Sequence, residues 1–184
     1  MSLKTPICDF GQAAKSFELK STSNEIIKLH DIKGENGTLV MFICNHCPYV
    51  IAVIKDIIED SKNLEELGIK SVAICSNDSI NYPEDSFDKM IKFHKDHNFN
   101  FPYLLDETQM VAKDYGAVCT PDFFGYNKKL ELQYRGRIRE LKNLEPIKSG
   151  ESDLFKAMKQ ISQTSRGPKE QDPSMGCGIK WFGN

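Results

Sequence analysis

The feature that most constrains this chain is an uninterrupted apolar segment that ends at a cysteine. Residues 38–44 read Thr-Leu-Val-Met-Phe-Ile-Cys, which is typical of a central β-strand buried on both faces. From Pro48 onward, apolar residues recur every three or four positions, and the first turn of a helix tolerates a proline. The sequence therefore predicts a buried strand that brings Cys44 to its carboxyl end, followed by a helix that begins at Cys47 or just before it.

Strand and helix patterns alternate along much of the remaining chain. Alternating strands and helices favour a parallel sheet with crossover connections, whereas period-two patterns on either side of a turn predict antiparallel hairpins. Together they predict an α/β fold with a mixed central sheet flanked by helices and with an N-terminal β-hairpin. The predicted elements are hairpins over 16–20/25–29 and 122–126/130–134, a strand at 69–75, and helices at 83–97, 107–115 and 151–163.

Length and composition suit one globular domain. The chain has 184 residues, 40% of them hydrophobic, and we assign residues 1–164 to this domain. Residues 165–184 have prolines and glycines but no regular period, so they are expected to form an irregular C-terminal tail packed on or near the domain.

Charge and hydropathy exclude two classes of partner. A formal net charge of −2 lacks the excess of basic residues that phosphate backbones require, so no nucleic-acid partner is expected. No apolar run approaches the length of a membrane span and the N-terminus has no signal-like apolar segment, so we expect no membrane association and a cytoplasmic location.

The spacing of Cys44 and Cys47 points to redox chemistry. A thiolate is the nucleophile in disulfide exchange, and a second thiol three residues away on a helical turn can close or release a mixed disulfide. The positive end of the helix dipole favours the thiolate, and a protonated His46 would favour it further. We therefore expect Cys44 to be the acidic, attacking thiol and Cys47 to be the resolving thiol.

The order of these strands, helices and motifs resembles the thioredoxin superfamily. The resemblance covers most of residues 10–164 and consists of the strand, Cys44-Asn-His-Cys47-Pro48, the helix, and Thr120-Pro121 ahead of an antiparallel hairpin. It implies a thioredoxin-like fold in which Pro121 follows a cis peptide bond and faces the cysteine pair, with the Thr120 backbone presented to a substrate.

A narrower resemblance is to a peroxiredoxin-like branch of the alkyl-hydroperoxide-reductase and thiol-specific-antioxidant group. It is carried by Cys-Asn-His-Cys-Pro-Tyr-Val and by the ending Gly176-Cys-Gly-Ile-Lys-Trp181. This resemblance implies an alternative function, a thiol peroxidase in which Cys47 is the peroxidatic cysteine. However, Cys44 stands where such enzymes have Thr or Ser, and Thr120-Pro121 aligns with their active-site arginine.

A metal-binding carrier is the alternative from a different class of function. Cys44, His46 and Cys47 could provide ligands for zinc or copper, completed by Cys177, His94 or His97. An isolated pair of cysteines provides only half of a tetrahedral site, and we therefore expect no metal and no dissociable cofactor.

We predict from these observations a thiol–disulfide oxidoreductase with Cys44, Cys47, His46, Thr120 and Pro121 at its centre. Its partners would be protein or small-molecule disulfides and thiols, together with an unidentified electron donor. Cys177 is predicted to be a third redox cysteine held in a flexible tail. An equally supported alternative is that the tail only packs on the domain and that Cys177 has no redox role. Cys75 and Cys119 are expected to be small packed residues, and Trp181 is expected to anchor the tail.

Overall fold

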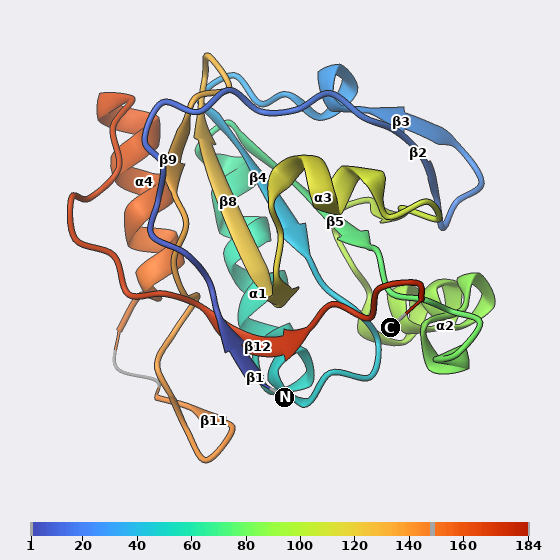
Figure 1. The fold of residues 1–184 in the computed structure, drawn as a ribbon. Coiled ribbons are helices and arrows are strands. Elements are labelled where there is room, and N and C mark those ends of the chain that lie inside the picture. The colour runs from blue at the N-terminus through green and yellow to red at the C-terminus, as the bar shows by residue number, and fades with distance from the viewer. Residues whose placement is uncertain (1, 148–149, 184) are drawn as a thin grey trace.

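A computed structural model describes residues 2–147 and 150–183 and shows a seven-stranded mixed sheet at its centre (Figure 1). The strand order is β3-β2-β6-β5-β4-β8-β9. The central strand β4 pairs in parallel with β5 and antiparallel with β8. The strands of this sheet are β2 (Glu18–Ser21), β3 (Ile26–Lys28), β4 (Gly37–Phe42), β5 (Ile69–Cys75), β6 (Tyr103–Leu105), β8 (Asp122–Asn127) and β9 (Leu132–Tyr134).

Helices cover both faces of the sheet, as Figure 1 shows. Alternate residues of β4 explain why: Leu39 and Met41 pack into one apolar cluster, whereas Val40 and Phe42 pack into another. All four side chains are buried, which confirms that this strand is central and covered on both faces. The first cluster is closed by α1 (Pro48–Glu66), α2 (Phe87–His97) and α4 (Asp153–Thr164), and the second by α3 (Met110–Tyr115).

The predicted elements are largely confirmed, with differences at their ends. Helix α1 begins at Pro48 with Cys47 as its N-cap, as the proline in the first turn predicted. The single helix predicted at 83–97 is instead a short 3-10 turn, η2 (Pro83–Asp85), and α2, separated by Ser86 in an extended conformation. A second 3-10 turn, η1 (Leu29–Ile32), follows the N-terminal hairpin.

The C-terminal segment differs from the predicted irregular tail. Residues Met175–Gly178 form β12, which lies between β1 (Ser2–Lys4) and β7 (Cys119–Thr120) in a separate three-stranded sheet. Figure 1 shows this strand running across the amino end of β8 and close to the start of α1. The sequence analysis missed it because a Met-Gly-Cys-Gly strand has neither apolar alternation nor β-branched residues. A remaining hairpin, β10 (Leu141–Lys142) with β11 (Glu145–Pro146), projects near the start of α4.

Among the residues that the structure describes, no helix combines the length and apolar character that crossing a bilayer requires.

Helix α1 also carries a buried carboxyl group that couples folding to pH. Asp60 is 6% exposed and accepts a hydrogen bond from the Ser152 hydroxyl at the N-cap of α4. Burial raises the pKa of Asp60 from 3.8 to about 6, against the opposing effects of Ser152 and Arg139. Because the folded-state pKa is raised, this group favours folding below pH 4 and loses that contribution as pH rises through 6.

We therefore expect the free energy of unfolding to fall between pH 4 and pH 7 by up to about 3 kcal/mol through Asp60 alone. Asp60→Asn removes the charge but keeps an acceptor for Ser152, so the variant should show a flatter pH dependence in urea-unfolding experiments. Glu66→Gln, at an exposed position in the last turn of α1, is the matched control. The same slope in Asp60→Asn and the wild type would contradict this assignment.

Candidate functional site

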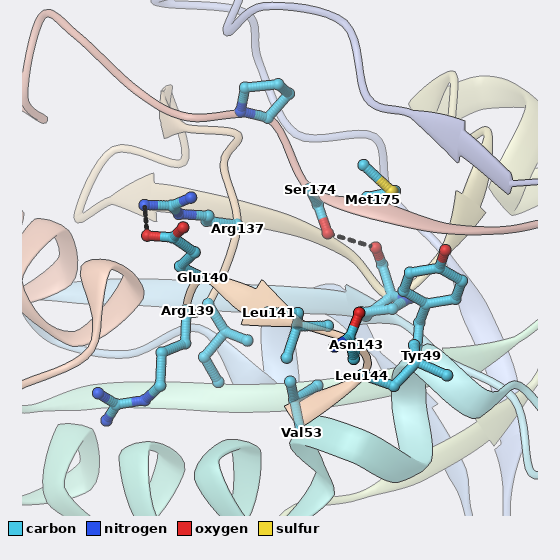
Figure 2. A pocket seen from close by; sticks show the side chains of 13 residues that line it. Tyr49, Val53, Arg137, Arg139, Glu140, Leu141, Asn143, Leu144, Ser174 and Met175 are labelled. Carbon is cyan, nitrogen blue, oxygen red and sulfur yellow. Dashed lines mark hydrogen bonds and ion pairs between the residues drawn. The ribbon is translucent and has the colours of Figure 1, made fainter. Parts of the chain in front are cut away.

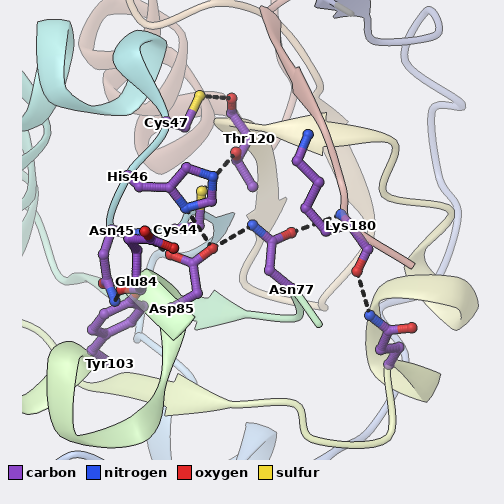
Figure 3. Close-up of polar contacts among 11 residues, drawn as sticks. Cys44, Asn45, His46, Cys47, Asn77, Glu84, Asp85, Tyr103, Thr120 and Lys180 are labelled. Carbon is purple, nitrogen blue, oxygen red and sulfur yellow. Dashed lines mark hydrogen bonds and ion pairs between the residues drawn. The ribbon is translucent and has the colours of Figure 1, made fainter. Parts of the chain in front are cut away.

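Cys44 and Cys47 lie between the end of β4 and the first turn of α1, and both are buried. Each sulfur contacts a different atom of Thr120 (Figure 3). The Cys47 thiol donates to the Thr120 carbonyl oxygen at 3.1 Å, and Cys44 Sγ lies 3.2 Å from Thr120 Oγ1. The two thiols are also close enough for each to shift the pKa of the other. The structure thus brings together the pair and the threonine that the sequence predicted.

The segment opposite the pair has the predicted geometry. The Thr120-Pro121 peptide bond is cis, and Thr120 is buried at the end of β7. This confirms that the segment faces the cysteine pair, as the resemblance implied.

A buried carboxylate, which the sequence analysis did not identify, organises the loop that contains His46. Asp85 is fully buried and accepts hydrogen bonds from the Asn45 N–H at 2.8 Å and from Asn77 Nδ2 at 2.7 Å. His46 Nδ1 lies 2.8 Å from Asp85 Oδ2, and the imidazole stacks on Tyr82. Figure 3 shows this polar network beneath the cysteine pair. The Pro-Glu-Asp segment reads as the start of a helix, so its sequence gives no sign that Asp85 points inward.

The surroundings of the two thiols separate their pKa values. The hydrogen bond from Cys44 lowers the pKa of Cys47 to about 5, against burial and with help from Cys177 and the Val50 N–H in the first turn of α1. The pKa of Cys44 is raised because the same hydrogen bond favours its protonated form, and because it is buried near the charge of Asp85. The more acidic thiol is therefore Cys47.

This order reverses the expectation that Cys44 is the acidic thiol. The expectation assumed that the end of a strand exposes Cys44, but Cys44 is only 1% exposed. Cys47 occupies the N-cap of a 19-residue helix, where unpaired N–H groups stabilise a negative charge.

Strand β12 places a third cysteine at the site. Cys177 lies directly opposite Thr120 in the β7–β12 pairing, and its side chain and backbone both interact with the Cys47 side chain. The predicted proximity of Cys177 to the pair is therefore present. The predicted flexible tail is wrong, because Cys177 is part of a strand paired on both sides.

The ligand set of the metal-binding alternative is only partly brought together. Cys44, His46 and Asp85 offer ligand atoms within 4.8 Å of one another. His94 and His97, in contrast, lie on α2, where His94 contacts Thr22 and both rings pack near Phe99. Asp85 already accepts two hydrogen bonds, which a metal would have to compete with.

The remaining cysteines have the expected packing roles. Cys75 and Cys119 are fully buried, and burial raises the pKa of each thiol, to about 12 for Cys75. Trp181 packs against the apolar cluster on the α3 side of the sheet, with the Lys113 ammonium over its ring. It therefore anchors the C-terminal segment, as the sequence predicted.

A groove of about 420 Å³ adjoins the site (Figure 2). Its walls include Tyr49 of α1, Pro121, the apolar side chains of Leu141 and Leu144, and Met175 of β12. Tyr49 and Met175 each lie two residues from a cysteine of the site, Cys47 and Cys177 respectively. The groove therefore lies beside the cysteines, although none of the three lines it.

Comparison with known proteins supports the predicted fold. The model of the AhpC/TSA family matches residues 10–141. A conserved uncharacterized protein from Geobacillus kaustophilus is 35% identical with a TM-score of 0.94, over 100% of this chain and 98% of its own. The hypothetical protein SMc02350 from Sinorhizobium meliloti 1021 is 32% identical with a TM-score of 0.89, over 98% of each chain.

A more distant relative in structure is the thioredoxin domain of a thiol-disulfide oxidoreductase from Bacteroides vulgatus. It is 14% identical with a TM-score of 0.58, over 68% of this chain and 86% of that domain, and so shows the shared thioredoxin-like fold. None of the curated proteins matches the chain.

The hydrogen bond between the two thiols gives a test of which thiol is acidic. Cys44→Ala removes the donor and should raise the pKa of Cys47 by about one to two units, the value of a hydrogen bond to a charged group. Cys44→Ser keeps a donor and should preserve most of the low pKa. Thiolate absorbance near 240 nm, followed against pH, measures both shifts. A wild-type transition near pH 5 that survives in Cys47→Ser would instead assign the acidic thiol to Cys44.

Proposed function

Because the chain belongs to the AhpC/TSA family, we propose that it is a thiol–disulfide oxidoreductase in which Cys44 and Cys47 alternate between a dithiol and a disulfide. The placement of both thiols on one residue is the observation that carries this proposal: both sulfurs contact Thr120, and each thiol shifts the pKa of the other. Neighbouring thiols can close a disulfide with the release of two electrons and two protons.

The low pKa of Cys47 makes it the first nucleophile in the proposed reaction. Its thiolate attacks a substrate disulfide, forms a mixed disulfide and releases one substrate thiolate. The Cys44 thiol then loses its proton and attacks Cys47 Sγ, which releases the second substrate thiolate. His46, with a ring nitrogen near Cys44 Sγ, is placed to accept the Cys44 proton, and Asp85 orients the imidazole.

The alternative function, a thiol peroxidase with Cys47 as peroxidatic cysteine, is supported by the same low pKa. The surrounding charges favour it less, because peroxide chemistry of the resembled kind uses an arginine. The arginines of the hairpin region are committed elsewhere: Arg135 binds the buried Asp122, Arg137 binds Asp153 and Arg139 binds Asp56. Thiol–disulfide exchange needs no such cation.

The metal-binding carrier receives no support from the family or from the related structures. The partners we propose are thiols and disulfides together with an electron donor, and the cytoplasmic location stays a prediction of the sequence.

Redox equilibration with glutathione tests the proposed function. Mixtures of reduced and oxidised glutathione should convert the wild type fully between the dithiol and the Cys44–Cys47 disulfide, as quantified by alkylation and mass spectrometry. Cys44→Ser and Cys47→Ser should both prevent this disulfide, whereas Cys75→Ser should not. In parallel, hydrogen peroxide should oxidise the wild type no faster than it oxidises an ordinary low-pKa thiol. Rapid peroxide turnover without an intermediate Cys44–Cys47 disulfide would select the peroxidase instead.

The buried charge of Asp85 gives a second prediction for the same couple. Asp85→Asn removes a negative charge that raises the pKa of Cys44, so it should make the Cys44 thiolate easier to form. The rate at which Cys44 resolves a mixed disulfide rises with the fraction of Cys44 that is thiolate. We expect faster release of glutathione from a Cys47–glutathione mixed disulfide in Asp85→Asn, measured by stopped alkylation at neutral pH.

The matched control is Glu84→Gln, which neutralises an exposed carboxylate next to Asp85. An unchanged rate of glutathione release in Asp85→Asn, or an equal change in both variants, would remove Asp85 from the electrostatics of the pair.

A further inference from the structure

Strand β12 covers the site where a partner would otherwise reach the cysteine pair. It pairs with the backbone of Cys119 and Thr120, and an added Cβ on Gly176 would lie 2.0 Å from the Thr120 carbonyl oxygen. Only glycine at this position allows the strand to lie so close to the site. A partner therefore cannot pair with the backbone of Thr120 while β12 is in place.

The strand is fixed at both of its ends. Before Cys177, the Ser174 hydroxyl donates to the Pro121 carbonyl oxygen at 2.8 Å, and the Ser174 N–H donates to Thr5. After Cys177, the Lys180 N–H donates to Asn77 at 2.9 Å, and Gln109 donates to the Lys180 carbonyl oxygen. Release of β12 would break all of these contacts. A partner is therefore expected to exchange electrons with the buried pair while β12 stays in place, rather than by displacing the strand.

The three thiols differ in their access to solvent. Cys44 and Cys47 are 1% and 0% exposed, whereas Cys177 is partly exposed and acts on the pKa of Cys47. Of the three thiols, Cys177 is therefore the one at which a protein-sized thiol or disulfide would attack while β12 stays in place.

From this arrangement we infer that Cys177 is a shuttle thiol, which carries disulfide exchange between a protein partner and the buried Cys44–Cys47 pair. The inference rests on the proposed function and adds both the class of partner, a protein dithiol or disulfide, and the residue that the partner attacks.

The proposed steps balance in atoms and electrons. In the oxidised protein, the Cys177 thiolate attacks Cys47 Sγ, so that a Cys47–Cys177 bond forms, the Cys44–Cys47 bond breaks and Cys44 leaves as a thiolate that takes a proton from solvent. A protein dithiol then attacks Cys177 Sγ and releases the Cys47 thiolate. Its second thiol attacks the mixed disulfide and releases Cys177. The dithiol loses two electrons and two protons. The Cys44–Cys47 pair gains both electrons and one proton, which Cys44 holds, while the other proton stays in solvent because Cys47 remains a thiolate.

Electrostatics favours this order of events. In the reduced protein, burial and the neighbouring Cys47 raise the pKa of Cys177 to about 11, which leaves Cys177 protonated and unreactive. When Cys47 is part of a disulfide, its charge and its hydrogen bond are removed, and the Cys177 thiolate becomes easier to form. Burial still raises the pKa of Cys177 in that state, but oxidation of the pair removes both contributions of Cys47, so Cys177 is more reactive when the pair is oxidised than when it is reduced.

The first experiment measures how fast a protein dithiol, a reduced thioredoxin, reduces the Cys44–Cys47 disulfide. Cys177→Ser should slow this reduction at least about tenfold, which is more than the accompanying change in the equilibrium of the pair with glutathione accounts for, because Cys177 acts mainly on the route of exchange. Cys8→Ser, a partly buried cysteine outside the site, should react like the wild type. A wild-type rate in Cys177→Ser would overturn the inference.

The second experiment traps the intermediate. Cys44→Ser treated with one equivalent of oxidised glutathione should form a Cys47–Cys177 disulfide and release two molecules of glutathione. A stable glutathione adduct on Cys47 with Cys177 as a free thiol would also overturn the shuttle. These failures differ from failure of the proposed function, because in that case Cys177→Ser would form no Cys44–Cys47 disulfide at all.

Discussion

The contacts of Thr120 connect the fold of this protein to its chemistry. Its carbonyl oxygen accepts the Cys47 thiol, its hydroxyl contacts Cys44, and its backbone pairs with Cys177. These contacts come from three distant parts of the chain: the β4–α1 junction, β7 and β12. The Cys47 thiol thus donates to a backbone carbonyl of the same residue that pairs with β12. The site is therefore part of what holds the C-terminal segment on the domain.

The cysteine pair lies between two opposing electrostatic influences. On one side, the N-terminus of α1 and the neighbouring thiols stabilise a negative charge on Cys47. On the other side, the buried carboxylate of Asp85 disfavours a charge on Cys44. Because their pKa values are shifted in opposite directions, the two thiols have different roles in exchange. Cys47 is ready to attack at neutral pH, whereas Cys44 holds its proton until a mixed disulfide has formed.

Local patterns in the sequence predicted those parts of the fold that depend on local physics. The apolar run before Cys44 predicted β4, and Pro48 with the apolar spacing after it predicted α1, because burial on both faces and helix periodicity are visible in single segments. Strand β12 and the inward orientation of Asp85 were not predictable in this way. The strand is held by pairing with β1 and β7, and Asp85 is held inside by Asn45 and Asn77, so both depend on contacts between segments far apart in the chain.

Which of the two thiols is more acidic could not be predicted from local sequence patterns either. The spacing of Cys44 and Cys47 indicated thiol redox chemistry, and that level of prediction agrees with the AhpC/TSA family. Which thiol carries the charge depends on where the hydrogen-bond donors and the carboxylate lie in three dimensions. A helix N-cap, a facing thiol from β12 and a carboxylate from the segment after β5 all act on one pair. These groups lie far apart in the sequence, so only the folded structure brings their effects on the pair together. In that structure the acidic thiol is Cys47, which lies beside Cys177.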